Sequence, residues 1–430
     1  MGKENKEIKG EILLPSSKSI SNRALIIQAL CEEKFQIQIL SDADDTKLLI
    51  KLLEQIYKHS DSSNQLGTKV ELNAKNSGTV FRFLVSFLCL KEGKWLLTGI
   101  ERMKDRPVGV LVETLKTMGA KISYLEKQGF PPLLIEGGKL ESKQVVIDAS
   151  ISSQFVSSLL LIAPMLENGL IIKLKSKVVS KPFIGMTANM MNRFGVDVDW
   201  KENILSVGKE KYKASTYIVE SDWTSASYWY EIVSFSDNIE IVLKGLKKNS
   251  IQGDSVIAEI FKKFGVKTEF LIDGVRLSKT KNIVKEYEFD FSNYLDLAQT
   301  VAVTCAALNI KANLFGLENL KIKETDRLLA LQNELQKLEV QSEIVNDSRF
   351  IIQNKKTLDL TKLKDIQIST YDDHRMALAF APLALLIKNI KIENPSVINK
   401  SYPGFWNDLK EVGFGVEIEN YQPVARISAI

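Results

Sequence analysis

The sequence predicts an α/β fold built from repeated units, and three observations lead to this prediction. One local pattern recurs along the chain: an amphipathic helix ends at a Gly or a substitute, and a strand of alternating residues follows. The chain has 430 residues, more than one hydrophobic core usually serves, so two domains are expected. No stretch rich in Pro, Gly and Ser separates them, which indicates a tight hinge. The turn residues recur at intervals of about 70 residues, at Gly119, Gly195, Gly265, Glu339 and Gly413.

Each recurrence predicts a strand directly after the turn residue. The expected strands cover residues 121–124, 197–200, 267–270, 341–344 and 415–418. A first, looser copy should end near residues 56–57, and six units of about 70 residues would then fill the chain. Apolar runs at helical spacing predict buried helices at 24–30, 80–90, 155–165, 328–338 and 376–387.

Several of the expected helices begin with Pro or Asp and carry a cation beside that residue. Such cations are Arg106, Lys181, Lys323, Arg327 and Lys400. A cation at a helix start lies beside the positive end of the helix dipole. This is unfavourable unless an anion binds there and offsets the charge of the cation and the positive end of the dipole. If the repeats are related by pseudo-symmetry, their helix starts would converge on one anion-attracting cleft.

The segment Lys323-Glu324-Thr325-Asp326-Arg327 is the most unusual of these starts. Glu324 and Asp326 are ordinary in a first helical turn, whereas Lys323 and Arg327 are not. A carboxylate held among cations is a candidate acid or base with an adjusted pKa. A solvated first turn with surface salt bridges explains the same residues equally well.

Three polar segments precede apolar helices in the first half of the chain. They are 15–23 with Lys18, Ser19 and Arg23, 76–79 with Asn76 and Gly78, and Ser152-Ser153-Gln154. Their hydroxyl, amide and cationic groups suit a hydroxylated, anionic ligand. Capping of the helices by the serines, with a plain turn at Gly78, is the competing explanation.

Two further candidates stand in the second half. Asp296 lies among apolar residues and is either a helix cap or a base with a raised pKa. His374 alone would more often be structural, but Arg375 stands beside it where the apolar run 376–387 begins.

Composition excludes several classes of function. Charged residues make up 26% and hydrophobic residues 45%, as in soluble globular proteins. A net charge of +4 is too small to indicate nucleic-acid binding, yet it allows a local basic cleft. The longest apolar run is too short to span a bilayer, and no signal segment is recognisable. Three cysteines and two histidines form no metal-binding pattern, so we expect no metal and buried thiols in a reducing cytoplasm.

Taken together, these segments resemble the 5-enolpyruvylshikimate-3-phosphate synthase family, the 3-phosphoshikimate 1-carboxyvinyltransferases. The family's fold is a two-domain inside-out α/β barrel of six βαβαββ repeats, three per domain. The resemblance implies one domain of residues 1–17 plus 222–430 and another of 18–221, with a cleft and hinge between them. The matching segments are 15–23, 76–82, 102–107, 152–154, 179–182, 225–228, 251–254, 323–327, 373–376 and Lys400.

The resemblance also implies the reaction. The enolpyruvyl group of phosphoenolpyruvate would pass to the 5-hydroxyl of shikimate 3-phosphate through a tetrahedral addition–elimination intermediate, releasing phosphate. The product would serve chorismate and aromatic amino acid biosynthesis, and glyphosate would mimic phosphoenolpyruvate. No cofactor, nucleic acid or membrane partner is implied, and the enzyme would be a cytoplasmic monomer.

Residue by residue, the resemblance implies two substrate sites that share members. Shikimate 3-phosphate would contact Lys18, Ser19, Arg23, Ser152, Ser153, Gln154, Ser180, Asp296, Asn319 and Lys323. Phosphoenolpyruvate would contact Lys18, Asn76, Gly78, Arg106, Gln154, Lys323, Arg327, Arg375 and Lys400. The catalytic residues would be Asp296 as base for the hydroxyl and Glu324 as proton shuttle, with Lys18 and Lys323.

The sequence departs from the family pattern at four positions. Phe183 replaces the usual Tyr, Ser16 and Lys75 each replace a Gly, and Phe83 stands where many members have Pro. These changes bear on affinity and inhibitor sensitivity rather than on the reaction. Two alternatives stay open: the sister enolpyruvyl transferase acting on UDP-N-acetylglucosamine, whose loop Cys has no evident counterpart here, and a non-catalytic anion-binding homologue.

Overall fold

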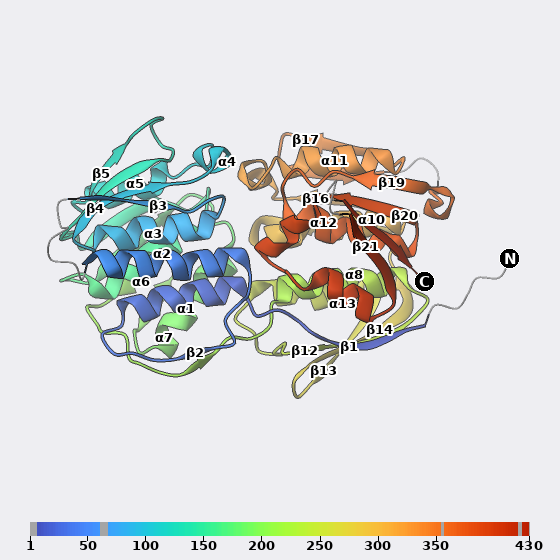
Figure 1. Ribbon diagram of the computed structural model, residues 1–430, viewed down its shortest axis with the longest axis horizontal. Helices are drawn as coiled ribbons and strands as arrows, with labels where there is room; N and C mark the ends of the chain where they lie inside the picture. The colour runs from blue at the N-terminus through green and yellow to red at the C-terminus, as the bar shows by residue number, and fades with distance from the viewer. Residues whose placement is uncertain (1–6, 61–67, 354–356, 420–423, 430) are drawn as a thin grey trace. The chain divides into compact units, whose positions relative to one another are not determined.

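The computed structural model describes residues 7–60, 68–353, 357–419 and 424–429 (Figure 1). Contacts between residues divide the chain into two compact units. The N-terminal unit is Lys18–Val219, and the C-terminal unit joins the chain up to Ser17 with Glu220–Ile430. No helix among the described residues is both long and apolar enough to cross a membrane.

The described residues form five four-stranded sheets with one shared topology. In β3 (Lys69–Asn73), β4 (Gly93–Thr98), β5 (Lys121–Tyr124) and β6 (Leu133–Gly137), the first two strands pair in parallel and the fourth lies between the second and third. Helices α3 (Gly78–Cys89), α4 (Glu101–Lys104) and α5 (Gly109–Thr117) connect the first three strands. Parallel neighbouring strands require such helical crossovers, so each sheet belongs to one βαβαββ repeat.

The other four repeats have this order. The second repeat of the N-terminal unit has β7 (Gln144–Asp148), α6 (Ser153–Ile162), β8 (Leu170–Lys175), α7 (Lys181–Arg193), β9 (Val198–Lys201) and β10 (Ile204–Val207). The C-terminal unit contains β1 (Glu7–Leu13), α8 (Trp223–Phe235), β12 (Asn238–Lys244), α9 (Ile257–Lys262), β13 (Phe264–Leu271) and β14 (Gly274–Ile283). It also contains β15 (Glu286–Asp290), α10 (Ala298–Ala307), β16 (Lys311–Phe315), α11 (Arg327–Lys337), β17 (Ser342–Val345) and β18 (Arg349–Ile352). Its last repeat has β19 (Lys364–Ile368), α12 (His374–Phe380), β20 (Lys388–Glu393), α13 (Phe405–Glu411), β21 (Phe414–Glu419) and β22 (Val424–Ala429).

The sixth repeat is reduced within the described part of the chain. It contains α1 (Lys18–Leu30), α2 (Asp44–Ser60) and the two-stranded parallel sheet of β2 (Ile37–Gln38) and β11 (Tyr217–Ile218). The expected end of this copy near residues 56–57 is wrong, because α2 continues to Ser60.

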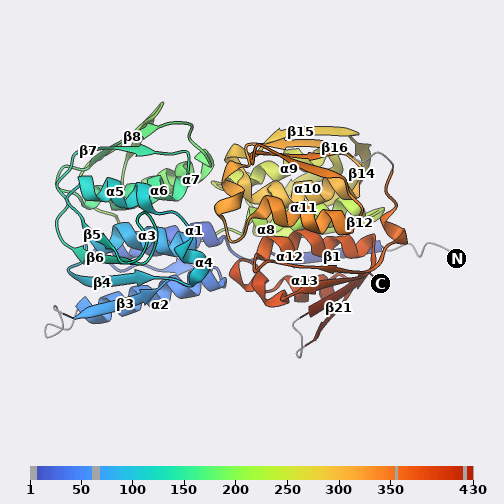
Figure 2. The same ribbon diagram turned by 90° about the horizontal axis from the view of Figure 1, so that it is seen from above.

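Within each unit the sheets surround buried helices, as the predicted inside-out α/β fold requires. In the N-terminal unit α3 packs on α6, and Figure 2 shows both between the sheet of β7 and β8 and the sheet of β3 and β4. In the C-terminal unit α8, α10 and α12 contact one another, and nearly all their side chains are buried. The strands alternate buried and exposed residues, as in β8, so one sheet face covers the helices and the other meets water.

Two expected helices end earlier than predicted, for the same reason. The run 155–165 becomes α6, followed by a 3-10 turn with Pro164, and the run 376–387 becomes α12, followed by a 3-10 turn with Pro382. Proline has no N–H group to donate and disfavours continued α-helix before it.

All five predicted turn residues have the left-handed backbone conformation, with φ of 93° at Gly119, 80° at Gly195, 78° at Gly265, 60° at Glu339 and 97° at Gly413. After α11 the N–H of Glu339 donates to the Gln336 carbonyl at 3.0 Å, and that of Val340 to Leu335 at 3.1 Å. This is the paired hydrogen bonding of a Schellman motif, in which glycine is the usual left-handed residue. Glu339 meets the same requirement with a side chain attached.

We expect Glu339→Gly to stabilise the protein by about 0.5–1 kcal/mol, because glycine removes the steric cost of a left-handed side chain at the expense of some chain entropy. Urea unfolding measures the change. Gly413→Ala is the reciprocal control: its added methyl would have no atom within 4 Å, so only backbone conformation should destabilise it. A less stable Glu339→Gly protein would contradict this explanation of the repeat.

Candidate active site

Helix starts in the C-terminal unit bring oppositely charged side chains together. Asp296 lies in a 3-10 turn just before α10, Arg327 begins α11 and Arg375 is the second residue of α12. Asp296 accepts from Arg375 Nη2 at 2.8 Å and from Arg327 Nη1 at 3.3 Å. We call Asp296, Glu324, Arg327, Asp373, Arg375 and Lys400 the carboxylate–cation cluster.

Arg327 lies at the centre of this cluster, with its side chain only 1% exposed. Its Nε donates to Asp373 Oδ2 at 2.6 Å and its Nη2 to Glu324 Oε2 at 2.9 Å. Burial disfavours the guanidinium charge, but the carboxylates of Asp373, Glu324 and Asp296 raise the pKa of Arg327 above its usual value. This arginine therefore forms ion pairs with three carboxylates from separate segments and holds them close together.

Glu324 lies before α11, and its carboxylate joins two cations. It accepts from Arg327 and, through Oε1, from Lys400 Nζ at 3.0 Å, with its side chain only 9% exposed. Asp326 caps the helix by accepting from the Leu329 N–H at 3.2 Å, as expected for a start residue. The first-turn salt bridge is thus buried, and the alternative of a solvated one is wrong for Glu324 and Arg327.

Without ligand, Asp296 is neither a helix cap nor a carboxyl with a raised pKa. Its carboxylate forms ion pairs, and the adjacent 3-10 helices have no side-chain cap from it. Burial would raise the pKa of Asp296, but Arg375, Lys323 and Arg327 outweigh burial and lower it. Asp296 is therefore charged and held by cations when no ligand is present.

Asp254, in the segment 251–254 that matches the family pattern, is a buried carboxyl beside this cluster. Its Oδ2 accepts from Thr224 Oγ1 at 2.5 Å, while its buried Oδ1 has no hydrogen-bond partner. Burial, and then the charge of Asp296, raise the pKa of Asp254 to about 7, against the influence of Thr224 and Arg375. The signal available in the sequence was its place at a repeat's helix start.

In the N-terminal unit, Arg23 is buried in the middle of α1. Its Nη1 donates to the Ser19 carbonyl at 2.9 Å, and its Nε donates to Thr187 Oγ1 at 2.7 Å. Lys18, at the first position of α1, forms an ion pair with Asp45 at 3.2 Å. Arg23 thus contacts Ser19 through the backbone carbonyl of Ser19.

Gln154 joins the starts of α3 and α6. Its Oε1 accepts from Arg82 Nη1 at 2.6 Å, and its Nε2 donates to Thr79 Oγ1 at 2.8 Å. Ser152 caps α6 by accepting from the Gln154 N–H at 3.3 Å, so the capping explanation is correct for this serine. Arg82 lies in the segment 76–82 that matches the family pattern, but it was not among the predicted site residues.

Gly78 makes room for two arginines. A Cβ at this position would lie 2.5 Å from Arg82 Nη1 and 2.7 Å from Arg106 Nη2. Arg106 Nη1 also donates to the Asn76 carbonyl at 3.0 Å. The glycine therefore lets both guanidinium groups approach the first turn of α3, where backbone N–H groups attract anions.

Two other predicted residues also lie at helix starts. Ser180 is the left-handed residue before α7, with φ of 52°, and Asn319 lies in the 3-10 helix Glu318–Ile322. Lys75, which replaces a family Gly, is left-handed as well, with φ of 49°. The backbone there has the conformation that a glycine adopts without strain.

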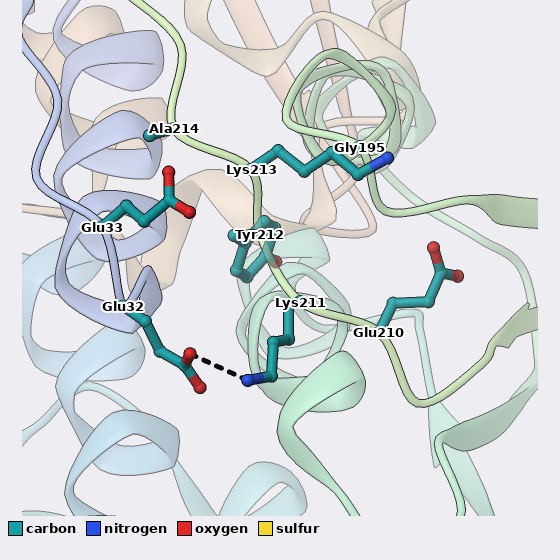
Figure 3. A pocket seen from close by; sticks show the side chains of 8 residues that line it. All are labelled: Glu32, Glu33, Gly195, Glu210, Lys211, Tyr212, Lys213 and Ala214. Atoms are coloured by element: carbon teal, nitrogen blue, oxygen red, sulfur yellow. Dashed lines mark hydrogen bonds and ion pairs between the residues drawn. The ribbon is translucent and has the colours of Figure 1, made fainter.

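The predicted cation and hydroxyl residues do not line the pocket in Figure 3, which belongs to the N-terminal unit and has a volume of about 380 Å³. Among the residues that line it, Glu32 and Lys211 form an ion pair at 2.8 Å.

Nearby, Cys31 contacts the Tyr212 carbonyl and is partly exposed, so its predicted burial is wrong. Cys89 and Cys305 are buried as expected.

His374 is buried at the start of α12, with Nδ1 3.5 Å from Asp373 Oδ1. Among the residues that the structure describes, no group of His, Cys, Asp and Glu side chains is arranged to hold a metal ion.

We expect Asp254→Asn to change how stability depends on pH. A folded-state pKa above the unfolded value means that stability is lost as pH rises from about 4 towards 7, because the buried carboxyl must ionise. The amide cannot ionise and can still accept from Thr224. Between pH 5 and pH 8 the variant should therefore gain at least about 1 kcal/mol relative to the parent protein in urea unfolding. A constant difference at both pH values would contradict a raised pKa.

Comparisons with known proteins identify the family and support the fold. The family model EPSP synthase (3-phosphoshikimate 1-carboxyvinyltransferase) matches residues 3–409. A 3-phosphoshikimate 1-carboxyvinyltransferase of Bacteroides fragilis is 43% identical over 413 residues, covering 96% of this chain and 97% of the relative. One from Vibrio campbellii is 37% identical, covering 94% and 97%. An EPSP synthase structure from Acinetobacter baumannii has a TM-score of 0.74 at 21% identity, covering 97% and 98%, and so shares the fold. This chain belongs to the EPSP synthase family.

Proposed function

We propose that this protein transfers the enolpyruvyl group of phosphoenolpyruvate to the 5-hydroxyl of shikimate 3-phosphate. Its family and the names of its relatives support this activity, which belongs to aromatic amino acid biosynthesis. The observation that carries the proposal in this chain is the carboxylate–cation cluster. Binding anions needs only cations, whereas this cluster also contains Asp296 and Glu324, which can move protons.

The proposed substrate contacts follow the family resemblance. Shikimate 3-phosphate would bind Lys18, Ser19, Arg23, Ser152, Ser153, Gln154, Ser180, Asp296, Asn319 and Lys323. Phosphoenolpyruvate would bind Lys18, Asn76, Gly78, Arg106, Gln154, Lys323, Arg327, Arg375 and Lys400, and we add Arg82 because it meets Gly78 and Gln154. Both ligands are polyanions, and the buried cations would offset their repulsion and stabilise charge that develops in the transition state.

Two proton transfers accompany the addition step. The 5-hydroxyl oxygen bonds to C2 of phosphoenolpyruvate and gives its proton to Asp296, while C3 receives a proton from Glu324. Glu324 would enter the addition step protonated. In the elimination step C3 returns that proton to Glu324, the C3–H electron pair forms the C2–C3 double bond, the C2–O bond to phosphate breaks, and the phosphate leaves with the proton that Asp296 took from the hydroxyl. Lys323 and Lys18 would stabilise the negative charge on the reacting groups.

Ligand binding would also prepare Asp296 to act as a base. Without ligand, Arg375, Lys323 and Arg327 lower the pKa of Asp296, which makes its carboxylate a weak base. Anionic groups of phosphoenolpyruvate at these cations would share their charge, and the pKa of Asp296 would then rise. The base would thus become effective only when the second substrate is present.

We also propose that residues 1–17 plus 222–430 and 18–221 are the two domains, and that the enzyme is a cytoplasmic monomer. The free thiols of Cys31, Cys89 and Cys305 fit a reducing compartment. Light scattering of the purified protein tests the oligomeric state.

The decisive assay is release of phosphate from phosphoenolpyruvate by the purified chain. Release that requires shikimate 3-phosphate supports the proposed activity. Release that requires UDP-N-acetylglucosamine instead would identify the sister transferase, and binding of both ligands without release would identify a non-catalytic homologue.

We expect Glu324→Gln to lower turnover at least about 100-fold, since the amide keeps the shape of the side chain but cannot transfer a proton. Calorimetry should show little change in the affinity for shikimate 3-phosphate. Asp326→Asn is the matched control, because it changes a nearby carboxylate that caps α11, and asparagine caps equally well. Near-normal turnover of Glu324→Gln would remove this residue from the mechanism.

We expect ordered, synergistic binding, because the residues proposed for each substrate come from both units. Shikimate 3-phosphate would favour a closed state through its higher affinity for that state, and so complete the phosphoenolpyruvate site. Phosphoenolpyruvate or glyphosate should therefore bind much better after shikimate 3-phosphate, and small-angle scattering should show compaction with shikimate 3-phosphate alone. Equal calorimetric affinity with and without the first substrate would rule out this coupling.

A further inference from the structure

Arg23 is a buried cation with neutral hydrogen-bond partners. Its side chain is almost inaccessible to water, at 2% exposure. Besides Thr187 and the Ser19 carbonyl, Nη2 donates to Ser157 Oγ at 3.4 Å and to the Phe183 carbonyl at 3.2 Å. Every one of these acceptors is a hydroxyl or a peptide oxygen, so none offsets the positive charge.

The contrast with Arg327 shows how unusual this is. Arg327 is equally buried, yet it forms ion pairs with Asp296, Glu324 and Asp373. Buried charges are normally paired in this way because removing them from water is costly. No carboxylate of the described chain lies within ion-pair distance of the Arg23 guanidinium, and burial accordingly lowers the pKa of Arg23.

Two aromatic rings take the place that a carboxylate would occupy. The Arg23 Cζ atom lies 5.3 Å from the ring centroid of Phe83 on α3 and 5.9 Å from that of Phe183 on α7. The face of an aromatic ring carries negative potential, and a cation within about 6 Å of its centroid is attracted to it. The attraction is stronger where water is excluded, and Phe83 is 1% exposed.

Rings and carboxylates hold a guanidinium with different consequences. A carboxylate cancels the charge, whereas a ring attracts the cation and leaves its net charge in place. Arg23 is thus fixed by α1, α3 and α7 while its charge stays available to an incoming anion. Fixing the group before the ligand arrives reduces the entropy lost on binding.

We propose that Phe83 and Phe183 are positioning residues that hold Arg23 for the anionic groups of shikimate 3-phosphate. This inference rests on the proposed function, because Arg23 is assigned there to that substrate. It also gives a role to two positions at which this sequence departs from the family pattern. The ring at 183 is common to Phe and Tyr, and Phe83 supplies the second ring.

The first test measures affinity. Phe83→Leu and Phe183→Leu should each weaken calorimetric binding of shikimate 3-phosphate about tenfold, which corresponds to about 1.4 kcal/mol. The KM for shikimate 3-phosphate should rise by the same factor with kcat nearly unchanged, since a ground-state contact is lost. Phe183→Tyr retains a ring and should bind at least as tightly as the parent protein.

Phe87→Leu is the matched control for loss of a buried ring. Phe87 is fully buried on the same helix, and its ring lies 5.1 Å from a different cation, Lys91, which has no proposed contact with substrate. It should lower the melting temperature about as much as Phe83→Leu while leaving the affinity for shikimate 3-phosphate within about twofold of the parent value. Equal weakening by Phe87→Leu would make the effect merely structural and overturn the proposal.

The second test does not depend on substrate. In protein with ¹⁵N-labelled arginine, the Arg23 Nε–Hε resonance, assigned by its loss in Arg23→Lys, should be displaced from those of exposed arginines by the ring currents. Phe83→Leu and Phe183→Leu should reduce this displacement, and Phe87→Leu should leave it unchanged. Unaltered resonances in both ring variants would overturn the proposal. A parent protein that shows the displacement but does not bind shikimate 3-phosphate would instead refute the proposed function.

Discussion

The ion pairs of Arg327 are the constraint on which the C-terminal unit's site depends. This one buried side chain contacts carboxylates from the turn before α10, the segment before α11 and the start of α12. Removing it would leave Asp373 buried without its strongest ion pair, and loss of one partner of a buried pair typically costs about 3–5 kcal/mol. The contact is possible only because the repeated topology brings α10 and α12 together in the core of the unit. The site therefore depends on the fold: the repeats bring the helix starts together, and Arg327 then fixes the side chains at these starts.

The buried arginines of the two units have different kinds of partner. This difference corresponds to the proposed division between anion binding and proton transfer. In the C-terminal unit carboxylates surround the arginines, and the cations lower the pKa of Asp296 while the carboxylates raise that of Arg327. In the N-terminal unit Arg23 has hydroxyl, peptide and aromatic partners, and Arg82 meets an amide and the ring of Phe155. Such surroundings hold a cation without neutralising it, which suits a surface that binds anions.

The parts that the sequence predicted correctly are those governed by local chemistry. The left-handed turns after the helices and the cap at Asp326 depend on a few consecutive residues, so the residue types alone revealed them. The errors arose where distant residues decide the outcome. The pKa of Asp296 is set by Arg375, which is far away in the sequence and close only in the fold, so an isolated carboxylate among apolar residues looked like a raised-pKa base. The predicted ends of α6 and α12 were wrong for a different reason. Pro164 and Pro382 are evident in the sequence, but the apolar periodicity was given more weight than these two prolines.

The departures from the family pattern affect different levels of the structure. Lys75, which stands where the family pattern has Gly, has a left-handed backbone with φ of 49°, and two hydrogen bonds hold it there: its N–H donates to Asn73 Oδ1 at 2.8 Å, and its carbonyl accepts from Ile100 at 3.1 Å. A side chain on a left-handed residue costs about 1–2 kcal/mol of backbone strain. Phe83 and Phe183 instead lie beside the buried guanidinium of Arg23, whose Cζ atom is 5.3 Å and 5.9 Å from their ring centroids. We therefore expect a substitution at Lys75 to change stability and substitutions at the two rings to change affinity, although all three positions differ from the same family pattern.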